Sequence, residues 1–201
     1  MDNTQCDRYQ VMLAGPVDEF LSMTEGMTSI EEAKFLYDLA REVRQGCIVE
    51  VGAYRGRSTV ALGRGSIDGH RVPVFTIEPH QPFTGVLGGK FGPPDAGAFY
   101  RAVLETGCYH VVRLISVSSE QVVQNWQVPV SLLWIDGDHR YEGVRRDFES
   151  WRPYLSDAAS VVFDDASDSA IGPYRLISEI VGPEFRKVKE FGKITVLERQ
   201  K

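Results

Sequence analysis

Apolar and polar positions along the chain follow two spacings, one typical of amphipathic helices and one typical of buried strands. Residues 29–43 carry apolar side chains at helical spacing, with Ser29 as a capping residue and Glu32 three positions later, which predicts a helix. Residues 47–51 form a short apolar run rich in β-branched side chains, which predicts a buried strand. A turn containing two glycines and a helical segment at residues 58–62 follow. This part of the chain therefore predicts a helix, a strand and a second helix.

The strand and helix patterns continue to alternate toward the carboxyl terminus. Further strands are predicted at residues 72–77, 111–115, 130–135 and 159–163, and further helices at residues 96–104, 120–126, 142–151 and 174–180. Such alternation is typical of a parallel sheet with helices on both faces. The last two segments, residues 185–190 and 194–198, are joined by a turn at 191–193 and predict a hairpin. We therefore expect an α/β fold with a seven-stranded, mostly parallel sheet and an antiparallel C-terminal hairpin strand.

Two regions lie outside this alternation. We expect residues 1–45 to form a helical lead-in to the first strand. Residues 81–95 are rich in glycine and proline, and we expect them to lack regular structure and to form a substrate-binding or lid loop. With 201 residues in total, the whole chain, 1–201, is expected to form a single domain.

Composition limits the classes of function. The 22 basic and 28 acidic residues give a net charge of −6, and no basic run is present, which argues against nucleic acid as a partner. No apolar stretch is long enough to cross a bilayer, and the first residues lack the order of a signal peptide, so no membrane association is expected. Three widely spaced cysteines fit reduced thiols, and we expect a cytoplasmic location.

The first chemical signal is the turn after the first predicted strand. Its pattern is E-x-G-x-x-x-G, with Gly52 and Gly56 as the glycines, and it differs from the G-x-G-x-x-G turn that cradles a pyrophosphate. Glu78 ends the second strand, 26 residues beyond Gly52, where an acid can accept hydrogen bonds from ribose hydroxyls. Ser118 and Ser119 follow the third strand. The pattern predicts a nucleoside ligand without a pyrophosphate, the alternative being a tight turn and a solvated strand end.

The second signal is a group of acids with a histidine. Asp136, Asp138 and His139 follow the fourth strand, and Asp164 and Asp165 follow the fifth. Carboxylates crowded at one sheet edge repel each other, and a hard divalent cation such as Mg²⁺ relieves the repulsion. The cation would lower the pKa of a substrate hydroxyl, and His139 would accept its proton. The alternative is an ordinary turn and a helix cap.

Two further polar residues have weaker signals. His80 follows Glu78 into the glycine-rich loop and could face substrate or cofactor, or be solvated. Asp147 is expected on an exposed helix face beside Arg145 and Arg146, with no function.

With these residues in place, the chain resembles the class I S-adenosylmethionine-dependent methyltransferases, whose fold is Rossmann-like. The resemblance rests on the segments VEVGAYRGRST and WIDGDHRYEGVRRDFESW, with MTSIEEAKFLYDLARE as a matching lead-in. The second segment, with its DGDHxYEG motif, is the specific one. Relatives include sugar and natural-product O-methyltransferases, among them actinobacterial enzymes that act on methylmannose polysaccharides.

The resemblance implies roles for individual residues. Asp136, Asp164 and Asp165 match the metal ligands of metal-dependent O-methyltransferases, although many members of this family carry a His-Asp pair in place of Asp164 and Asp165. The catalytic base stays open among His139, Asp136 and Asp138, of which His139 and Asp136 are our candidates. His80 and Tyr141 are candidates for contacting substrate. The residues expected to bind the cofactor are Glu50, Gly52, Ala53, Tyr54, Gly56, Ser58, Glu78, Ser118, Ser119 and Asp136.

The expected function is methyl transfer from S-adenosylmethionine, with Mg²⁺, to a hydroxyl of a sugar or oligosaccharide such as a mannoside, or of a related natural product. The expected partners are this small-molecule or oligosaccharide acceptor and a second copy of the chain in a homodimer. Two alternatives are a nicotinamide-dependent oxidoreductase on a similar sheet and a non-catalytic cofactor-binding protein. The first of these would need the G-x-G-x-x-G turn, which the first turn lacks.

Overall fold

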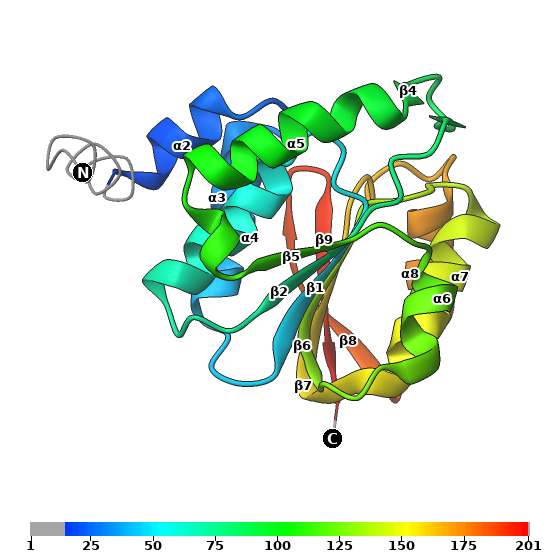
Figure 1. The fold of residues 1–201 in the computed structure, drawn as a ribbon. Helices are drawn as coiled ribbons and strands as arrows, with labels where there is room; N and C mark the ends of the chain where they lie inside the picture. Colours follow the sequence, from blue (N-terminus) through cyan, green and yellow to red (C-terminus); the bar gives the residue numbers. More distant parts are fainter. Residues whose placement is uncertain (1–14, 201) are drawn as a thin grey trace, which may run out of the picture.

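A twisted sheet runs through the centre of the molecule. The computed structural model describes residues 15–200, and within this range seven strands form the sheet in the order β5-β2-β1-β6-β7-β9-β8 (Figure 1). The strands are β1 (Cys47–Val51), β2 (Val74–Ile77), β5 (Val112–Ile115), β6 (Val130–Ile135), β7 (Leu155–Phe163), β8 (Phe185–Phe191) and β9 (Ile194–Arg199).

The strand directions agree with the sequence pattern. The neighbours among β5, β2, β1, β6 and β7 pair in parallel, whereas β9 pairs antiparallel with both β7 and β8. The predicted α/β fold with an antiparallel hairpin strand is confirmed. The order reverses between β1 and β6, and open α/β sheets bind ligands at the carboxyl ends of the strands beside such a switch point.

Helices cover both faces of the sheet, with α2 to α5 on one side and α6 to α8 on the other (Figure 1). Side chains alternate along each strand: in β6, Leu132 and Trp134 pack on the first side and Leu133 and Ile135 on the second. The helices are α2 (Val17–Met23), α3 (Ile30–Arg41), α4 (Arg57–Asp68), α5 (Pro93–Glu105), α6 (Ser119–Val122), α7 (Tyr141–Trp151) and α8 (Gly172–Ile180), with short 3-10 turns at Cys108–His110, Val123–Asn125 and Arg152–Tyr154.

Helix α3 begins where its sequence predicts. The Ser29 hydroxyl accepts a hydrogen bond from the Glu32 amide, and the Glu32 carboxylate accepts one from the Ser29 amide, so both sides of the capping box are formed. The helix belongs to the expected lead-in at residues 1–45, of which residues 1–14 lie outside the described part.

The structure corrects the expectation for residues 81–95. This segment contains a small hairpin of β3 (Phe83–Thr84) and β4 (Lys90–Phe91), and α5 begins inside it, at Pro93. Proline suits the first turn of a helix, and the Asp95 carboxylate accepts a hydrogen bond from the Gly92 amide at 2.9 Å, which stabilises that helix start. The turn-forming residues therefore organise regular structure here.

A second correction concerns Asp147, which was expected on an exposed face of its helix. Its position on α7 is 9% exposed, and burial raises its pKa to about 6, opposed by a hydrogen bond with Ser119. Arg145 and Arg146 are exposed as expected. Asp147 follows Arg146 directly on α7, and the rotation of one residue about the helix axis directs its side chain toward the interior of the protein.

Among residues 15–200, no helix is both long enough and apolar enough to span a bilayer. Both cysteines in this part of the chain, Cys47 and Cys108, are buried and free.

Candidate active site

A cavity of about 700 Å³ opens at the carboxyl edge of the sheet, beside the switch point between β1 and β6. Its floor is formed by residues that follow β1, β2, β6 and β7 and by the β8–β9 turn. Its sides are formed by the segment 26–28 and by the β3–β4 hairpin. The volume lies within the usual range for small-molecule sites. Of the predicted site residues, those that line it are Gly52, Ala53, Tyr54, Ser58, Glu78, Asp136, His139, Asp164 and Asp165.

Gly52 brings the end of β1 close to the loop after β6. It has a φ of +86°, and a Cβ at this position would lie 2.2 Å from the backbone oxygen of Asp136. Only glycine fits both the dihedral angle and the contact. Gly56 has a φ of +101° but packs against Phe99 of α5 and does not line the cavity.

Glu50 lies beneath the cavity and does not line it. Its carboxylate accepts hydrogen bonds from the hydroxyls of Ser58 and Thr59 at 2.6 Å and of Thr76 at 2.8 Å. Burial raises the pKa of Glu50 to about 7, although these three hydrogen bonds act in the opposite direction. The side chain thus joins β1 to β2 and to the first turn of α4, and it shapes the site from below.

Glu78 lines the cavity and orders the turn after β1. One of its oxygens accepts hydrogen bonds from the amides of Ala53 and Tyr54 at 3.1 and 3.2 Å, and the other accepts from the His80 amide at 2.8 Å. His80 lies behind this turn: its ring nitrogen Nε2 is 3.0 Å from the backbone oxygen of Tyr54, and its side chain does not line the cavity.

Three other predicted residues also lie away from the cavity lining. Ser118 bonds with the side chain of Gln121 at the start of α6, and the Ser119 hydroxyl accepts a hydrogen bond from Trp151 at 3.2 Å. The Tyr141 hydroxyl donates to Glu179 on α8 at 2.6 Å. A role for these residues in contacting cofactor or substrate stays a prediction.

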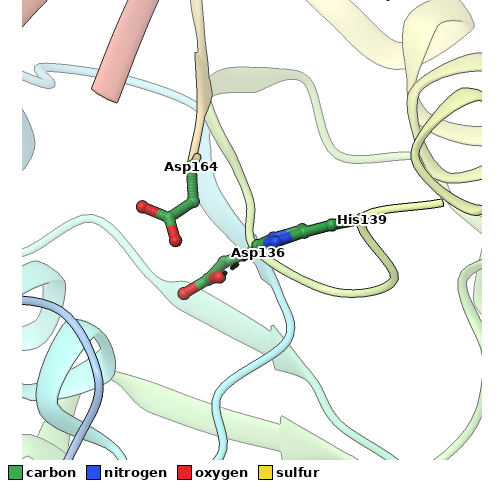
Figure 2. A group of neighbouring side chains, drawn as sticks. All are labelled: Asp136, His139 and Asp164. Atoms are coloured by element: carbon green, nitrogen blue, oxygen red, sulfur yellow. Dashed lines mark ion pairs between the residues drawn. The ribbon is translucent and has the colours of Figure 1, made fainter. Parts of the chain in front are cut away.

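The acidic residues and the histidine meet where β6 and β7 end side by side (Figure 2). His139 Nδ1 lies 3.0 Å from Asp165 Oδ2, and His139 Nε2 lies 3.4 Å from Asp136 Oδ1. Single ligand atoms of Asp136, His139 and Asp164 lie within 4.8 Å of one another. Asp138 lines the same cavity but accepts a hydrogen bond from the Arg140 amide at the start of α7.

The cluster shifts the pKa values of its members in opposite directions. Burial disfavours the charged imidazole of His139, but Asp136 and Asp165 outweigh it and raise its pKa to about 10. Contact with His139 lowers the pKa of Asp165 to about 2, whereas burial and the charge of Asp136 raise the pKa of Asp164. The neighbouring carboxylates therefore favour the charged form of His139, and this imidazole can bind a metal ion or accept a proton only after it has lost that proton.

The cluster fits a divalent cation. In the described part of the chain, Asp164 Oδ1 and His139 Nε2 are buried without a hydrogen-bond partner. Together with Asp136 they offer two oxygen donors and one nitrogen donor, a set that suits Mn²⁺ or another first-row ion as well as Mg²⁺. The group that lies close enough to hold an ion contains His139 beside Asp136 and Asp164, whereas Asp165 pairs with His139, and the expected role of Asp165 as a metal ligand stays a prediction.

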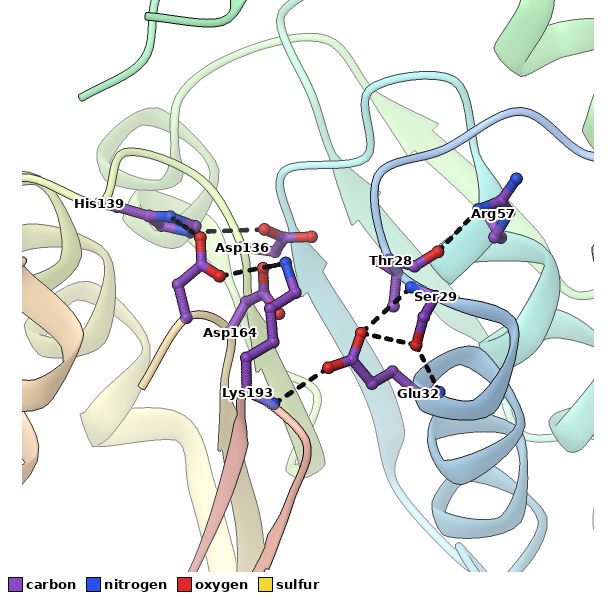
Figure 3. Close-up of polar contacts among 9 residues, drawn as sticks. Thr28, Ser29, Glu32, Arg57, Asp136, His139, Asp164 and Lys193 are labelled. Atoms are coloured by element: carbon purple, nitrogen blue, oxygen red, sulfur yellow. Dashed lines mark hydrogen bonds and ion pairs between the residues drawn. The ribbon is translucent and has the colours of Figure 1, made fainter. Parts of the chain in front are cut away.

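Sequence reasoning missed the lysine in this cluster. Lys193, in the β8–β9 turn, places its Nζ 2.8 Å from Asp164 Oδ2 and 3.1 Å from Asp165 Oδ1 (Figure 3). A lysine in a hairpin turn is usually a solvated surface residue, so the sequence carries no signal for this role.

Two arginines that shape the cavity walls were also missed. Arg57 donates to the backbone oxygens of Thr24 and Thr28 at 2.9 and 2.7 Å and so holds the segment 26–28 against the cavity. Arg140 donates to the backbone oxygen of Thr84 at 2.8 Å and ties the β3–β4 hairpin to the start of α7.

The family model of the methyltransferase domain matches residues 49–166, which is more than half of the chain. An O-methyltransferase from Bacillus cereus, solved in complex with SAH, has 17% sequence identity and a TM-score of 0.67, and the match covers 100% of this chain and 92% of that one. The O-methyltransferase TomG from Streptomyces achromogenes, involved in tomaymycin synthesis and solved with SAM, has 17% identity and a TM-score of 0.65, with 96% and 89% coverage.

The SAH-bound methyltransferase PaMTH1 from Podospora anserina has 16% identity and a TM-score of 0.67, with 100% and 97% coverage. At these identities the structural matches establish the shared fold. The family match spans the glycine turn after β1 and the acidic cluster after β6 and β7. It sets aside the nicotinamide-dependent alternative, and the chain belongs to the methyltransferase domain family and is a methyltransferase.

Proposed function

We propose that this methyltransferase transfers the methyl group of S-adenosylmethionine to a hydroxyl group, with a divalent cation bound beside that hydroxyl. One observation carries the proposal: a single cavity joins the Gly52–Glu78 end, suited to a nucleoside, to the cluster of Asp136, His139 and Asp164. A donor of the methyl group and its acceptor would therefore lie in one enclosed space, which favours direct transfer.

S-adenosylmethionine fits the Gly52–Glu78 end of the cavity. The turn after β1 presents backbone without a side chain at Gly52, and the Glu78 carboxylate lies at the end of β2, where it can accept hydrogen bonds from ribose hydroxyls. The solved complexes of the Bacillus cereus and Streptomyces achromogenes O-methyltransferases with SAH and SAM agree with this assignment.

The cation would be held by Asp136, Asp164 and His139, with Asp165 close by. A bound divalent cation supplies positive charge that lowers the pKa of a coordinated hydroxyl. The catalytic base stays open among His139, Asp136 and Asp138, all three of which line the cavity.

We propose a sugar, an oligosaccharide such as a mannoside, or a related natural product as the acceptor. The outer wall of the cavity carries the rings of Tyr54, Phe83 and Phe91, while the floor carries carboxylates. Aromatic rings can pack on the apolar face of a pyranose, and carboxylates can accept hydrogen bonds from its hydroxyls. A homodimer stays a prediction that sedimentation analysis of the purified protein would test.

The test is a transfer assay with methyl-labelled S-adenosylmethionine and a panel of mannosides, other glycosides and hydroxylated natural products. We expect transfer to an oxygen of a glycoside, loss of transfer after chelation with recovery on adding Mg²⁺ or Mn²⁺, and a decrease of about 100-fold in Asp164→Ala. Asp157→Ala is the matched control, because it removes an exposed acid from β7, the strand that Asp164 follows. Transfer that is unchanged by both the chelator and Asp164→Ala would refute the role of the cation.

A further inference from the structure

Lys193 brings a permanent positive charge into the group of acids. Its Nζ contacts Asp164 Oδ2 at 2.8 Å and Asp165 Oδ1 at 3.1 Å, and its side chain is 28% exposed against 3% for Asp164. It lines the same cavity as Asp136 and His139. The acids therefore already face a cation that belongs to the protein.

The backbone of the β8–β9 turn holds this lysine in place from two sides. The Lys193 amide donates to Glu32 Oε1 at 3.0 Å (Figure 3). The Lys193 carbonyl accepts a hydrogen bond from the Ala166 amide at 2.8 Å. Gly192 has a φ of +58°, and a Cβ there would lie 2.4 Å from Glu32 Oε1, so the turn and α3 are in close contact. The position of the lysine follows from packing across the molecule.

Glu32 links this turn to the start of α3. Its second carboxylate oxygen accepts hydrogen bonds from the Ser29 amide at 3.1 Å and from the Ser29 hydroxyl at 2.8 Å. One carboxylate thus caps a helix and holds the turn that carries Lys193 (Figure 3). These hydrogen bonds therefore hold the Lys193 ammonium group beside Asp164 and Asp165.

The two oxygens of Asp164 have different surroundings. Oδ2 contacts Lys193, whereas Oδ1 is buried without a hydrogen-bond partner among residues 15–200, and Asp164 is one of the three residues that could hold a cation. A cation bound through Asp164 would therefore share that carboxylate with the ammonium group. Two positive charges on one carboxylate repel each other, and the repulsion weakens binding of the second.

We propose that Lys193, held between Asp164 and Asp165, is a counter-ion that competes with the divalent cation for Asp164 and keeps the affinity of the site for that cation low. The inference rests on the cation of the proposed function. Unlike the ligand residues, Lys193 opposes binding of the cation, so that the site exchanges its cation readily.

The experiment measures Mn²⁺ binding to the chelator-treated full-length protein, using the electron paramagnetic resonance signal of free Mn²⁺. We expect Lys193→Met to bind Mn²⁺ at least about tenfold more tightly than the unmodified protein, because a charge of +1 close to a charge of +2 is removed. Lys193→Arg keeps the charge and should bind within about threefold of the unmodified protein.

Lys187→Met is the matched control, because it removes the same charge from the same hairpin at an exposed position paired with Glu190. It should leave Mn²⁺ affinity unchanged. Thermal unfolding of each variant without metal checks that the protein is folded, and Lys193→Gln gives a second uncharged variant in case Lys193→Met is unstable.

The possible results are distinct. Equal or weaker Mn²⁺ binding in Lys193→Met would overturn the counter-ion role while leaving the cation site intact. Tightening of the same size in Lys187→Met would also overturn it, because the effect would then come from net charge alone. If none of the folded proteins binds Mn²⁺ and S-adenosylmethionine still binds, the cation of the proposed function is refuted together with this inference.

Discussion

At the scale of single residues, the site depends on positions where no other side chain fits. Gly52 has a left-handed backbone conformation and lies in close contact with the backbone carbonyl group of Asp136. The contact brings the turn after β1 against the loop after β6, and these two segments form adjacent parts of the cavity floor. Gly52 therefore determines how close the proposed cofactor end of the cavity lies to its acidic end.

Replacing Gly52 by alanine should destabilise the fold. We expect Gly52→Ala to lower the free energy of unfolding by at least about 2 kcal/mol, because the new Cβ meets backbone atoms and the φ of +86° is strained for alanine. Urea unfolding followed by circular dichroism measures the effect.

Gly97→Ala is the control for this substitution. Gly97 lies within α5, and a Cβ added there would meet no neighbouring atom within 4 Å, so alanine at this position should stabilise the protein by about 0.5–1 kcal/mol. If both variants unfold at the same urea concentration, the close contact at Gly52 contributes nothing.

At the scale of elements, the β3–β4 hairpin is attached to the rest of the molecule at few points. The Arg140 guanidinium bonds the Thr84 carbonyl and lies 5.4 Å from the centre of the Phe83 ring, and the Phe91 ring meets the Tyr54 ring edge to face at 5.2 Å. These contacts hold the hairpin beside the cavity. Residues 83–91 of the expected loop are thus connected to the start of α7 through Arg140 and to the turn after β1 through Tyr54.

Arg140→Ala should loosen this hairpin without unfolding the protein. We expect amide hydrogen exchange in residues 83–91 to become about tenfold faster, because a hydrogen bond from a charged donor is lost. Global stability should change by less than about 0.5 kcal/mol. Hydrogen exchange followed by mass spectrometry compares the exchange rate of residues 83–91 with that of the rest of the protein.

Arg145→Ala, which removes an arginine one turn further along α7, serves as the comparison. In Arg145→Ala, the amides of residues 83–91 should exchange at the same rate as in the unmodified protein. An unaltered exchange rate in the Arg140→Ala hairpin would mean that the aromatic contacts alone hold the hairpin.

At the scale of the whole molecule, buried acids make stability depend on pH. Burial raises the pKa of Glu50 from 4.5 to about 7, so the folded state holds this proton more tightly than the unfolded state. Its contribution to stability is fully present below pH 4.5 and is lost as the pH rises through about 7. Asp147, whose pKa burial raises to about 6, contributes with the same sign.

Glu50→Gln should remove the larger of these two effects. We expect the stability of the variant relative to the unmodified protein to increase by roughly 3 kcal/mol between pH 4.5 and pH 8, because glutamine stays neutral. Urea unfolding at a series of pH values measures this difference. A difference that does not vary with pH would show that Glu50 is charged throughout the range.

Much of the fold can be predicted from local patterns. The capping box at Ser29 and Glu32 marks the start of α3, the largely apolar run at 130–135 matches β6, and the turn at Gly192 marks the terminal hairpin. These signals act over a few residues and do not depend on the rest of the chain. The sequence is less informative at residues 81–95, because glycine and proline occur in irregular loops and also in hairpin turns and at helix starts.

The sequence by itself determined the order of strands and helices, and with it the meeting of Gly52, Asp136 and Asp164 at one sheet edge, because parallel strands end on the same side. Only the tertiary structure decided what surrounds these residues. In the folded protein, Glu50 lies beneath the cavity, Asp147 is buried, and Lys193 contacts Asp164. Lys193 and Glu32 are 161 residues apart, and no local pattern records a contact that forms only when the hairpin packs against α3.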